Sequence, residues 1–235
     1  MKFKALTSNA KLTVYIDFKS PYAYIATQPC IELEKKLDLQ FDWRPLTLDI
    51  PSFLGSAKLD KKGKVSKSSR SVDQWVWVKH AYKDARRYAA LNNLTLRGTE
   101  KIWDSSLASI GLMWAKKHSH QILINYINAV YEPFWRRDLD IENIHVIEEK
   151  LKQAGADTVG FSEYLQGEGR EAHAQFQEDI FEARIFGVPS FVIEGEIFFG
   201  REHLPRIEWI LRGRRGEAPD IAYQNVNANH QVSYP

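Results

Sequence analysis

A short apolar run near the N-terminus, residues 12–16, is followed within four residues by the pair Ser20-Pro21. The length and β-branched composition of the run are typical of a buried strand. Serine is a preferred N-cap residue and proline a favoured first helical residue, so a helix is predicted over 21–37. Residues 39–43 then alternate apolar and polar side chains, which predicts a second strand. The first 46 residues therefore predict a β-α-β unit.

The middle of the chain differs in character. Residues 51–70 are rich in Lys, Ser and Gly, which predicts a long exposed loop. Helical spacing of apolar residues without strand alternation follows in five segments: 72–92, 99–117, 121–135, 141–154 and 161–167. About a hundred residues are thus expected to be helical.

The C-terminal third returns to mixed structure. A helix is predicted from Arg170 toward Phe186, then strands over 187–193 and 196–199. The intervening Glu194-Gly195 predicts a tight hairpin turn. Apolar spacing over 202–211 predicts a closing helix, and residues 212–235 lack periodicity and are expected to form a loosely ordered tail.

Composition excludes several classes of protein. Lys and Arg number 32 against 30 Asp and Glu, so the strongly basic face of a dedicated nucleic-acid binder is not expected. The sequence has neither a signal-peptide core nor a run of 18 apolar residues, which favours a cytoplasmic protein without a membrane span. The one cysteine, Cys30, excludes an intrachain disulfide, a Cys-x-x-Cys pair and a Cys-rich zinc site. The histidines show no ligand spacing, so no metal is predicted.

Two local signatures carry a family resemblance. Asp17-Phe-Lys-Ser20-Pro21-Tyr22 opens the first helix, where a redox thioredoxin would carry Cys-Pro-x-Cys, and Gly187-Val188-Pro189-Ser190 leads into the third strand, at the place of the cis-proline loop. With the element order β-α-β, helical insert, α-β-β-α, the chain resembles the DsbA-like thioredoxin fold. The Ser-Pro-Tyr variant is similar to glutathione-dependent 2-hydroxychromene-2-carboxylate isomerases and kappa-class glutathione transferases.

Further segments extend the resemblance over about residues 12–211. They are Trp43-Arg44-Pro45-Leu46, Phe53-Leu54-Gly55, the Asp84 to Ala89 helix segment, Phe134-Trp135 with Asp138 and Ile141, and Phe198 to Leu204. Glu202 and His203 stand where the family has Asp and Arg, and Gly63-Lys64 is the nearest match to a family Gly-Asn. The resemblance predicts an α/β chain with a thioredoxin-like domain from 1–50 and 170–211, a loop and helical insertion from 51–169, and the tail.

The resemblance also implies the chemistry. Ser20 would be the catalytic residue, stabilising the thiolate of glutathione for reversible addition to an aromatic or electrophilic small molecule. Pro21, Tyr22, Val188, Pro189, Arg201, Glu202 and His203 would bind glutathione. The Val188 backbone would pair with the tripeptide as an added strand does, and Glu202 would bind its ammonium group. Dimers are common in the resembling families, so a homodimer is one expected assembly.

The free energies of the interactions that Ser20 could make are large enough for this role. Lowering a thiol pKa of about 8.5 by about one and a half units requires roughly 2 kcal/mol. A hydrogen bond to an anion contributes about 1.5 to 3 kcal/mol, and a helix N-terminus up to about 2 kcal/mol. Ser20 would act on a ligand thiolate and not as a nucleophile, because the motif contains no general base for it. Cys30, about 15 Å further along the helix, is expected to be a buried structural thiol.

Other interpretations stay open. A kappa-class-like transferase would act on electrophiles with the same residues, and a non-redox DsbA-like protein would bind an extended peptide. Neither would be a dithiol-disulfide oxidoreductase. The lysines of the loop most simply form a solvated surface, although they could steer an anionic substrate. Four tryptophans, Trp75, Trp77, Trp103 and Trp114, are expected in the core more than at a ligand site, although the face between the helical insertion and the thioredoxin-like part is a natural cleft.

Overall fold

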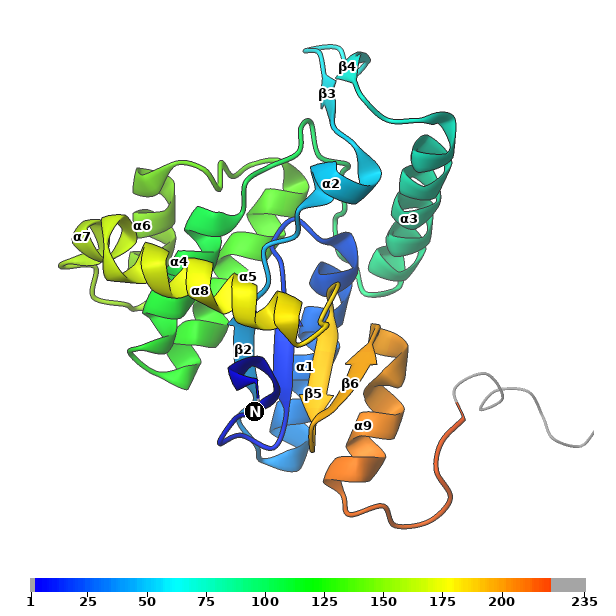
Figure 1. The fold of residues 1–235 in the computed structure, drawn as a ribbon, viewed down its shortest axis with the longest axis vertical. Coiled ribbons are helices and arrows are strands. Elements are labelled where there is room, and N and C mark those ends of the chain that lie inside the picture. The colour runs from blue at the N-terminus through cyan, green and yellow to red at the C-terminus, as the bar shows by residue number, and fades with distance from the viewer. Residues whose placement is uncertain (1–2, 221–235) are drawn as a thin grey trace, which may run out of the picture.

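A four-stranded mixed sheet lies at the centre of the structure, a computed structural model that describes residues 3–220 (Figure 1). Its strand order is β2-β1-β5-β6. The strands are β1 (Thr13–Ile16), β2 (Asp42–Pro45), β5 (Ser190–Ile193) and β6 (Glu196–Phe199). β1 pairs parallel to β2 and antiparallel to β5, and every residue of β1 is buried. The predicted β-α-β unit and the predicted C-terminal hairpin are both present.

Helix α1 (Pro21–Leu37) has the predicted bounds. The Ser20 hydroxyl caps its start by accepting the Ala23 N–H at 3.2 Å. The second strand begins later than predicted, at Asp42 and not at residue 39. The reason lies at the end of α1, where the Leu39 N–H donates to the Glu34 carbonyl and the Phe41 N–H to the Glu34 carboxylate. Residues 39–41 therefore complete the helix end and do not pair with β1.

The helical insertion has the expected content. Its helices are α3 (Val72–Leu91), α4 (Ser106–Lys116), α5 (His120–Arg136), α6 (Ile144–Ala154) and α7 (Phe161–Gln166), followed by α8 (Glu168–Glu182). The helix predicted from residue 99 starts only at Ser106. The Glu100 carbonyl instead accepts the Leu59 N–H, and the Asp104 carboxylate accepts the Ser106 N–H. In Figure 1, α4 to α8 gather on one side of the sheet and α3 stands on the other.

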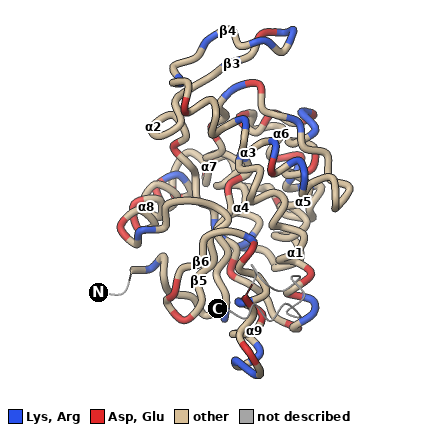
Figure 2. Tube along the Cα trace, turned by 90° about the vertical axis from the view of Figure 1, so that its right-hand side faces the viewer, with Lys and Arg blue, Asp and Glu red and all other residues tan. Residues whose placement is uncertain are grey.

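The prediction of a long loop over 51–70 is wrong. The segment forms a short helix, α2 (Ile50–Leu54), and a two-stranded hairpin, β3 (Ala57–Leu59) with β4 (Val65–Ser68). Its turn is held by the Asp60 carboxylate, which accepts the N–H groups of Lys62 and Lys64. The hairpin is exposed, as the polar composition predicts, and projects from the body with lysines at its end (Figure 2). A polar sequence thus predicted exposure correctly but not backbone pairing.

The C-terminal hairpin turns through Glu194 and Gly195, both at positive φ (53° and 84°), the conformation that favours glycine. The predicted closing helix is a 3-10 turn, η2 (Arg201–His203), followed by α9 (Leu204–Leu211). Of the predicted tail, residues 221–235 lie outside the described part. Within 212–220, Arg214 pairs with Glu194 at the hairpin turn.

One hydrophobic core joins the sheet to the helical insertion. Phe18, just after β1, packs against Tyr126 and Tyr131 of α5 at ring distances of 5.9 and 4.9 Å. Tyr15 of β1 stacks on Phe176 of α8. All four strands of the central sheet come from the two segments predicted to form the thioredoxin-like part, and α3 to α7 and the β3–β4 hairpin come from between them. The exact domain bounds remain a prediction.

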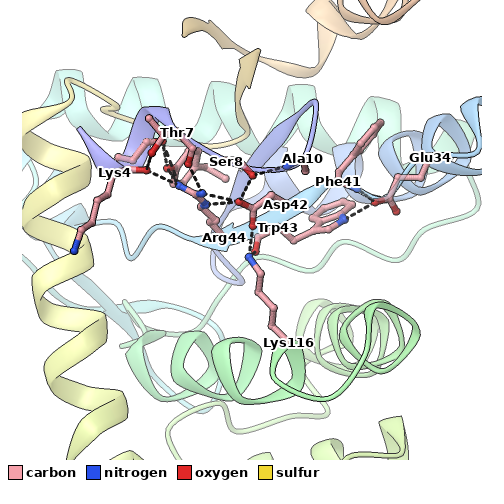
Figure 3. A network of polar contacts seen from close by, with 12 residues as sticks. Lys4, Thr7, Ser8, Ala10, Glu34, Phe41, Asp42, Trp43, Arg44 and Lys116 are labelled. Atoms are coloured by element: carbon pink, nitrogen blue, oxygen red, sulfur yellow. Dashed lines mark hydrogen bonds and ion pairs between the residues drawn. The ribbon is translucent and has the colours of Figure 1, made fainter. Parts of the chain in front are cut away.

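A network of charges ties the N-terminal segment to β2 (Figure 3). Arg44 pairs with Asp42 at 2.6 Å and donates to the Thr7 carbonyl, and Lys116 of α4 pairs with the same carboxylate. Burial opposes ionisation of Asp42, but Lys116, Arg44 and Ser8 outweigh it and lower its pKa. Burial lowers the pKa of Lys116 despite this contact, whereas the contacts of Arg44 with Asp42 raise the pKa of Arg44 against the effect of burial.

Replacing Asp42 leaves two cations without their shared partner. We expect Asp42→Ala to lower the free energy of unfolding by about 3 kcal/mol at pH 7, measured in urea. Because the folded pKa of Asp42 lies below the unfolded value, its contribution is complete above pH about 4 and is lost as the pH falls through the folded value. The difference from wild type should therefore shrink in acid.

The control is Arg212→Ala, which removes an exposed pair with Glu208 and should cost less than about 0.5 kcal/mol. An Asp42→Ala effect as small as that of the control, or one independent of pH, would contradict the role of the network.

Candidate functional site

A cavity of about 670 Å³ opens beside the start of α1. Ser20, Pro21 and Tyr22 line it from α1, and Gly187 and Val188 from the segment before β5. Its opposite wall is formed by α2, α3 and residues 98–103 of the helical insertion. The cavity thus lies between the two parts of the fold, and its volume falls in the range of small-molecule sites.

Ser20 is the deepest polar group of the α1 wall. The residue is 5% exposed, and its hydroxyl oxygen, while capping α1, lies 3.4 Å from the Val188 carbonyl, to which it donates. The two residues are 168 positions apart in the chain. The Val188-Pro189 peptide is cis. The structure therefore brings together the two sequence signatures, and the long Ser20 contact leaves the hydroxyl proton weakly held.

The remaining predicted binding residues lie outside the lining of the cavity. Pro189, Arg201, Glu202 and His203 do not line the cavity. The Arg201 guanidinium covers the Tyr88 ring at 3.8 Å, and His203 packs on Phe198. The Glu202 side chain folds over Gly200, in the space that a side chain at position 200 would fill. These side chains flank the site, and direct contact of Arg201, Glu202 or His203 with a ligand in the cavity would require them to reorient.

Tyr22 lines the cavity and also contacts helix α3. Its hydroxyl donates to the Asp84 carboxylate of α3 at 3.3 Å, and Asp84 also pairs with Arg87. Burial, with smaller effects from Asp84 and Glu202 and against that of Arg201, raises the pKa of Tyr22 to about 12. In the sequence, Asp84 is distinguished only as part of a helix segment. Its contact with Tyr22 depends on how α3 packs on α1, which no local pattern reveals.

Aromatic side chains form much of the cavity surface. The expectation that the tryptophans belong to the core is wrong for Trp75 and Trp77, which line the cavity, with Trp77 70% exposed. Trp103 also lines it while packing on Phe134 of the core. Trp114 lies elsewhere, in the helical insertion, and donates to the Asp157 carbonyl. An apolar aromatic wall suits a ligand with a flat ring.

Cations outnumber anions around the cavity. The basic lining residues are Lys19, Arg70, Lys79, Arg86 and Lys101, and the acidic one is Glu100. Such a wall favours an anionic ligand by electrostatic attraction. Cys30 is fully buried in the core, where burial raises its thiol pKa, and it does not reach this cavity. Reactive sulfur at the site would have to come from a ligand.

Residues 3–220 contain neither a cluster of three or more His, Cys, Asp or Glu side chains able to hold a metal ion nor a helix long and apolar enough to cross a membrane.

Sequence comparison relates the chain to one family. Residues 11–212 match the model of the DSBA-like thioredoxin domain. A 2-hydroxychromene-2-carboxylate isomerase of Sphingobium xenophagum is 25% identical over 202 residues, 84% of this chain and 95% of that protein. The enzyme of the same name from Pseudomonas putida is 25% identical over 198 residues, 83% and 90% of the two chains.

Solved structures agree on the fold. A structure of 2-hydroxychromene-2-carboxylate isomerase superposes with a TM-score of 0.64 at 21% identity, covering 86% of this chain and 94% of the other. A protein from Streptomyces coelicolor described as a "probable DsbA oxidoreductase" gives the same TM-score at 16% identity, covering 90% and 94%. A protein named as an isomerase and one described as a probable oxidoreductase therefore share this fold.

The Tyr22 contact with Asp84 yields a direct test. We expect Asp84→Asn to move the pKa of Tyr22 from about 12 toward 10.0, because the variant removes a carboxylate that disfavours the phenolate. Burial remains, so the value should stay above 10.0. Ultraviolet difference titration at 295 nm measures it, with Tyr22→Phe identifying the Tyr22 signal. An unchanged Tyr22 titration in Asp84→Asn would show that the two groups do not interact.

Proposed function

The chain belongs to the DSBA-like thioredoxin domain family, and we propose that it is a glutathione-dependent isomerase similar to the 2-hydroxychromene-2-carboxylate isomerases. The observation that carries the proposal is the Ser20 hydroxyl, placed at the N-terminus of α1, on the wall of an aromatic cavity, and only weakly held by the Val188 carbonyl. When bound, glutathione would supply the thiolate that adds reversibly to the substrate.

The residues present fit a small thiol peptide. Ser20 can turn its proton from the Val188 carbonyl, 3.4 Å away, toward a sulfur anion, while its oxygen continues to cap α1. The positive end of the helix dipole of α1 lies at the same point and adds a positive potential there. The carbonyl released by Ser20 would then be free to accept an N–H from an extended peptide. Ser20 and Val188 thus supply one donor for the sulfur and one acceptor for the backbone.

The flanking residues suit the charged end of the peptide. Arg201 and Glu202 lie close enough to influence the titration of Tyr22, which itself lines the cavity. The guanidinium of Arg201 attracts a carboxylate, and the carboxylate of Glu202 attracts an ammonium group. We propose that they reorient from Tyr88 and Gly200 when glutathione binds. Pro21 would form part of the wall without donating a hydrogen bond, since proline has no N–H, and Pro189 would fix the backbone next to Val188 from outside the cavity.

A dithiol-disulfide mechanism is not part of the proposal. The four positions that open α1 are Ser20, Pro21, Tyr22 and Ala23, and the one cysteine of the chain is buried further along the same helix. The cationic wall further favours an anionic aromatic substrate over a neutral electrophile. This observation supports the proposal of an isomerase over a kappa-class-like transferase or a peptide-binding protein.

The role of Ser20 predicts a measurable change in the thiol. Absorbance at 240 nm, followed against pH, reports the thiolate of bound glutathione. We expect a pKa below that of free glutathione in the wild type, and a pKa about 1 to 2 units higher in Ser20→Ala. The shift corresponds to a lost hydrogen bond to an anion of about 1.5 to 3 kcal/mol.

The matched control is Ser71→Ala. Ser71 caps α3 as Ser20 caps α1, but it does not line the cavity, so the variant should lose a cap without changing the thiol pKa. Calorimetry gives the affinity of each variant for glutathione. A wild-type protein that does not bind millimolar glutathione would refute the proposed function.

Product analysis separates the candidate activities. We expect the wild type with glutathione to isomerise a 2-hydroxychromene-2-carboxylate, and Ser20→Ala to lower kcat at least tenfold, with a smaller effect on KM. An aryl halide should yield little or no conjugate. Conjugation without isomerisation would instead assign a transferase, and peptide binding that survives Ser20→Ala without any turnover would assign a binding protein.

A further inference from the structure

A second cavity, of about 770 Å³, shares a wall with the candidate site. It lies under the hairpin β3–β4, between that hairpin and residues 101–104. The residues common to both cavities are Lys19, Leu48, Ala57 and 101–103. The hairpin projects at the top of Figure 1, next to α2 and the end of the loop that precedes α4. A ligand bound beside Ser20 could therefore extend under the hairpin.

Lys19 is the buried cation at the junction. Its side chain is 5% exposed, yet it borders both cavities, and it directly precedes Ser20 in the chain. Within residues 3–220 its one ion pair is with Asp17, at 3.7 Å, and its ammonium group forms no hydrogen bond there. An ammonium group has three donors, and a buried charge is stable only when it is paired and hydrogen-bonded. The Lys19 ammonium therefore retains donors for a ligand.

Asp17 is a partial counter-ion only. Its two carboxylate oxygens already accept the N–H of Lys19 at 3.1 Å and that of Leu48 at 2.8 Å. Burial raises the pKa of this carboxyl although Lys19 lowers it, so the low-polarity surroundings disfavour its charge. Asp17 therefore leaves donors of the Lys19 ammonium group, 3.7 Å away, without a hydrogen-bond acceptor.

Basic residues also outnumber acidic residues in the lining of the second cavity. Three further lysines line it, Lys58, Lys67 and Lys101, against two acids, Asp49 and Asp104. Asp49 accepts the Ser52 hydroxyl and Asp104 the Ser106 N–H. Against the effect of burial, Ser106 and, more weakly, Lys19 lower the pKa of Asp104, so Asp104 offsets part of the Lys19 charge. Lys101 pairs with Glu142 and is one-third exposed, and Lys58 and Lys67 stand on the exposed hairpin. Lys19 is the cation of this set that is both buried and open to a ligand.

We propose that Lys19 anchors the carboxylate of an aromatic acid, with that anionic end held where the two cavities meet and the ring packed against Trp103. The inference rests on the proposed function, because it names the residue that selects the charge and sets the position of the substrate at the same site. Lys19 would be a binding residue that orients the substrate toward Ser20. The hairpin lysines would contribute attraction at long range.

The test compares two ligands of nearly equal shape. We expect 2-naphthoate to bind the wild type at least tenfold more tightly than 2-naphthalenemethanol, as measured by calorimetry. In Lys19→Met, the affinity for the acid should fall about tenfold, to that of the alcohol, while the affinity for the alcohol stays within twofold. The control is Lys62→Met. Lys62 is an exposed lysine in the turn of the β3–β4 hairpin and lines neither cavity, so its replacement should leave both affinities unchanged.

Two results with the variants would contradict the proposed role of Lys19 as the residue that binds the carboxylate. An unchanged preference for the acid in Lys19→Met, or the same loss in Lys62→Met, would overturn it. Should Lys19→Met fail to fold, Lys19→Gln keeps a hydrogen-bond donor without the charge and should show the same loss. Equal binding of acid and alcohol to the wild type overturns the proposal without any variant.

Glutathione titration in parallel separates the two proposals. Binding of 2-naphthoate that depends on Lys19, without binding of glutathione, refutes the proposed function and keeps the anchor. Glutathione binding with no preference for the acid refutes the anchor alone.

Discussion

The buried carboxylate of Asp17 holds the junction on which the site depends. It accepts the N–H of Lys19, which shapes the turn from β1 into α1, and the N–H of Leu48, which follows β2. The Asp17 carbonyl accepts the Tyr131 hydroxyl of α5 at 3.0 Å. One residue therefore joins the sheet, the start of α1 and the helical insertion. The positions of Lys19 and Ser20 depend on this turn, which is fixed by hydrogen bonds to the Lys19 N–H, the Leu48 N–H and the Tyr131 hydroxyl.

The chemistry of the site follows from what this turn presents. A helix N-terminus and a hydroxyl favour a thiolate, but the chain has no thiol there, and Cys30 is enclosed in the core. The surrounding wall is aromatic and cationic, so it suits a ring that carries a negative charge. Sulfur and substrate would both be brought by ligands, and the protein would contribute orientation and electrostatic stabilisation.

Local chemistry made much of the fold predictable. The Ser20-Pro21 start, the end of α1 at Leu37 and the Glu194-Gly195 turn each depend on a few adjacent residues, and all three are found. The hairpin over 57–68 was missed because strand pairing there follows from the turn at Asp60 and a bond to Glu100, not from apolar alternation. The Trp75 and Trp77 positions were missed because helical spacing does not say which face another element covers.

The sequence by itself determined the order of elements and the serine in place of a redox cysteine, because both are properties of residue type or of local backbone preference. That this serine and the Val188-Pro189 segment form one site was implied by the family resemblance, and the structure shows the contact. Only the tertiary structure decided that Asp84 contacts Tyr22, that Arg201 and Glu202 do not line the cavity, and that Lys19 is buried where two cavities meet. Those contacts join residues from separate elements, and their geometry is set by how the helical insertion packs against the sheet.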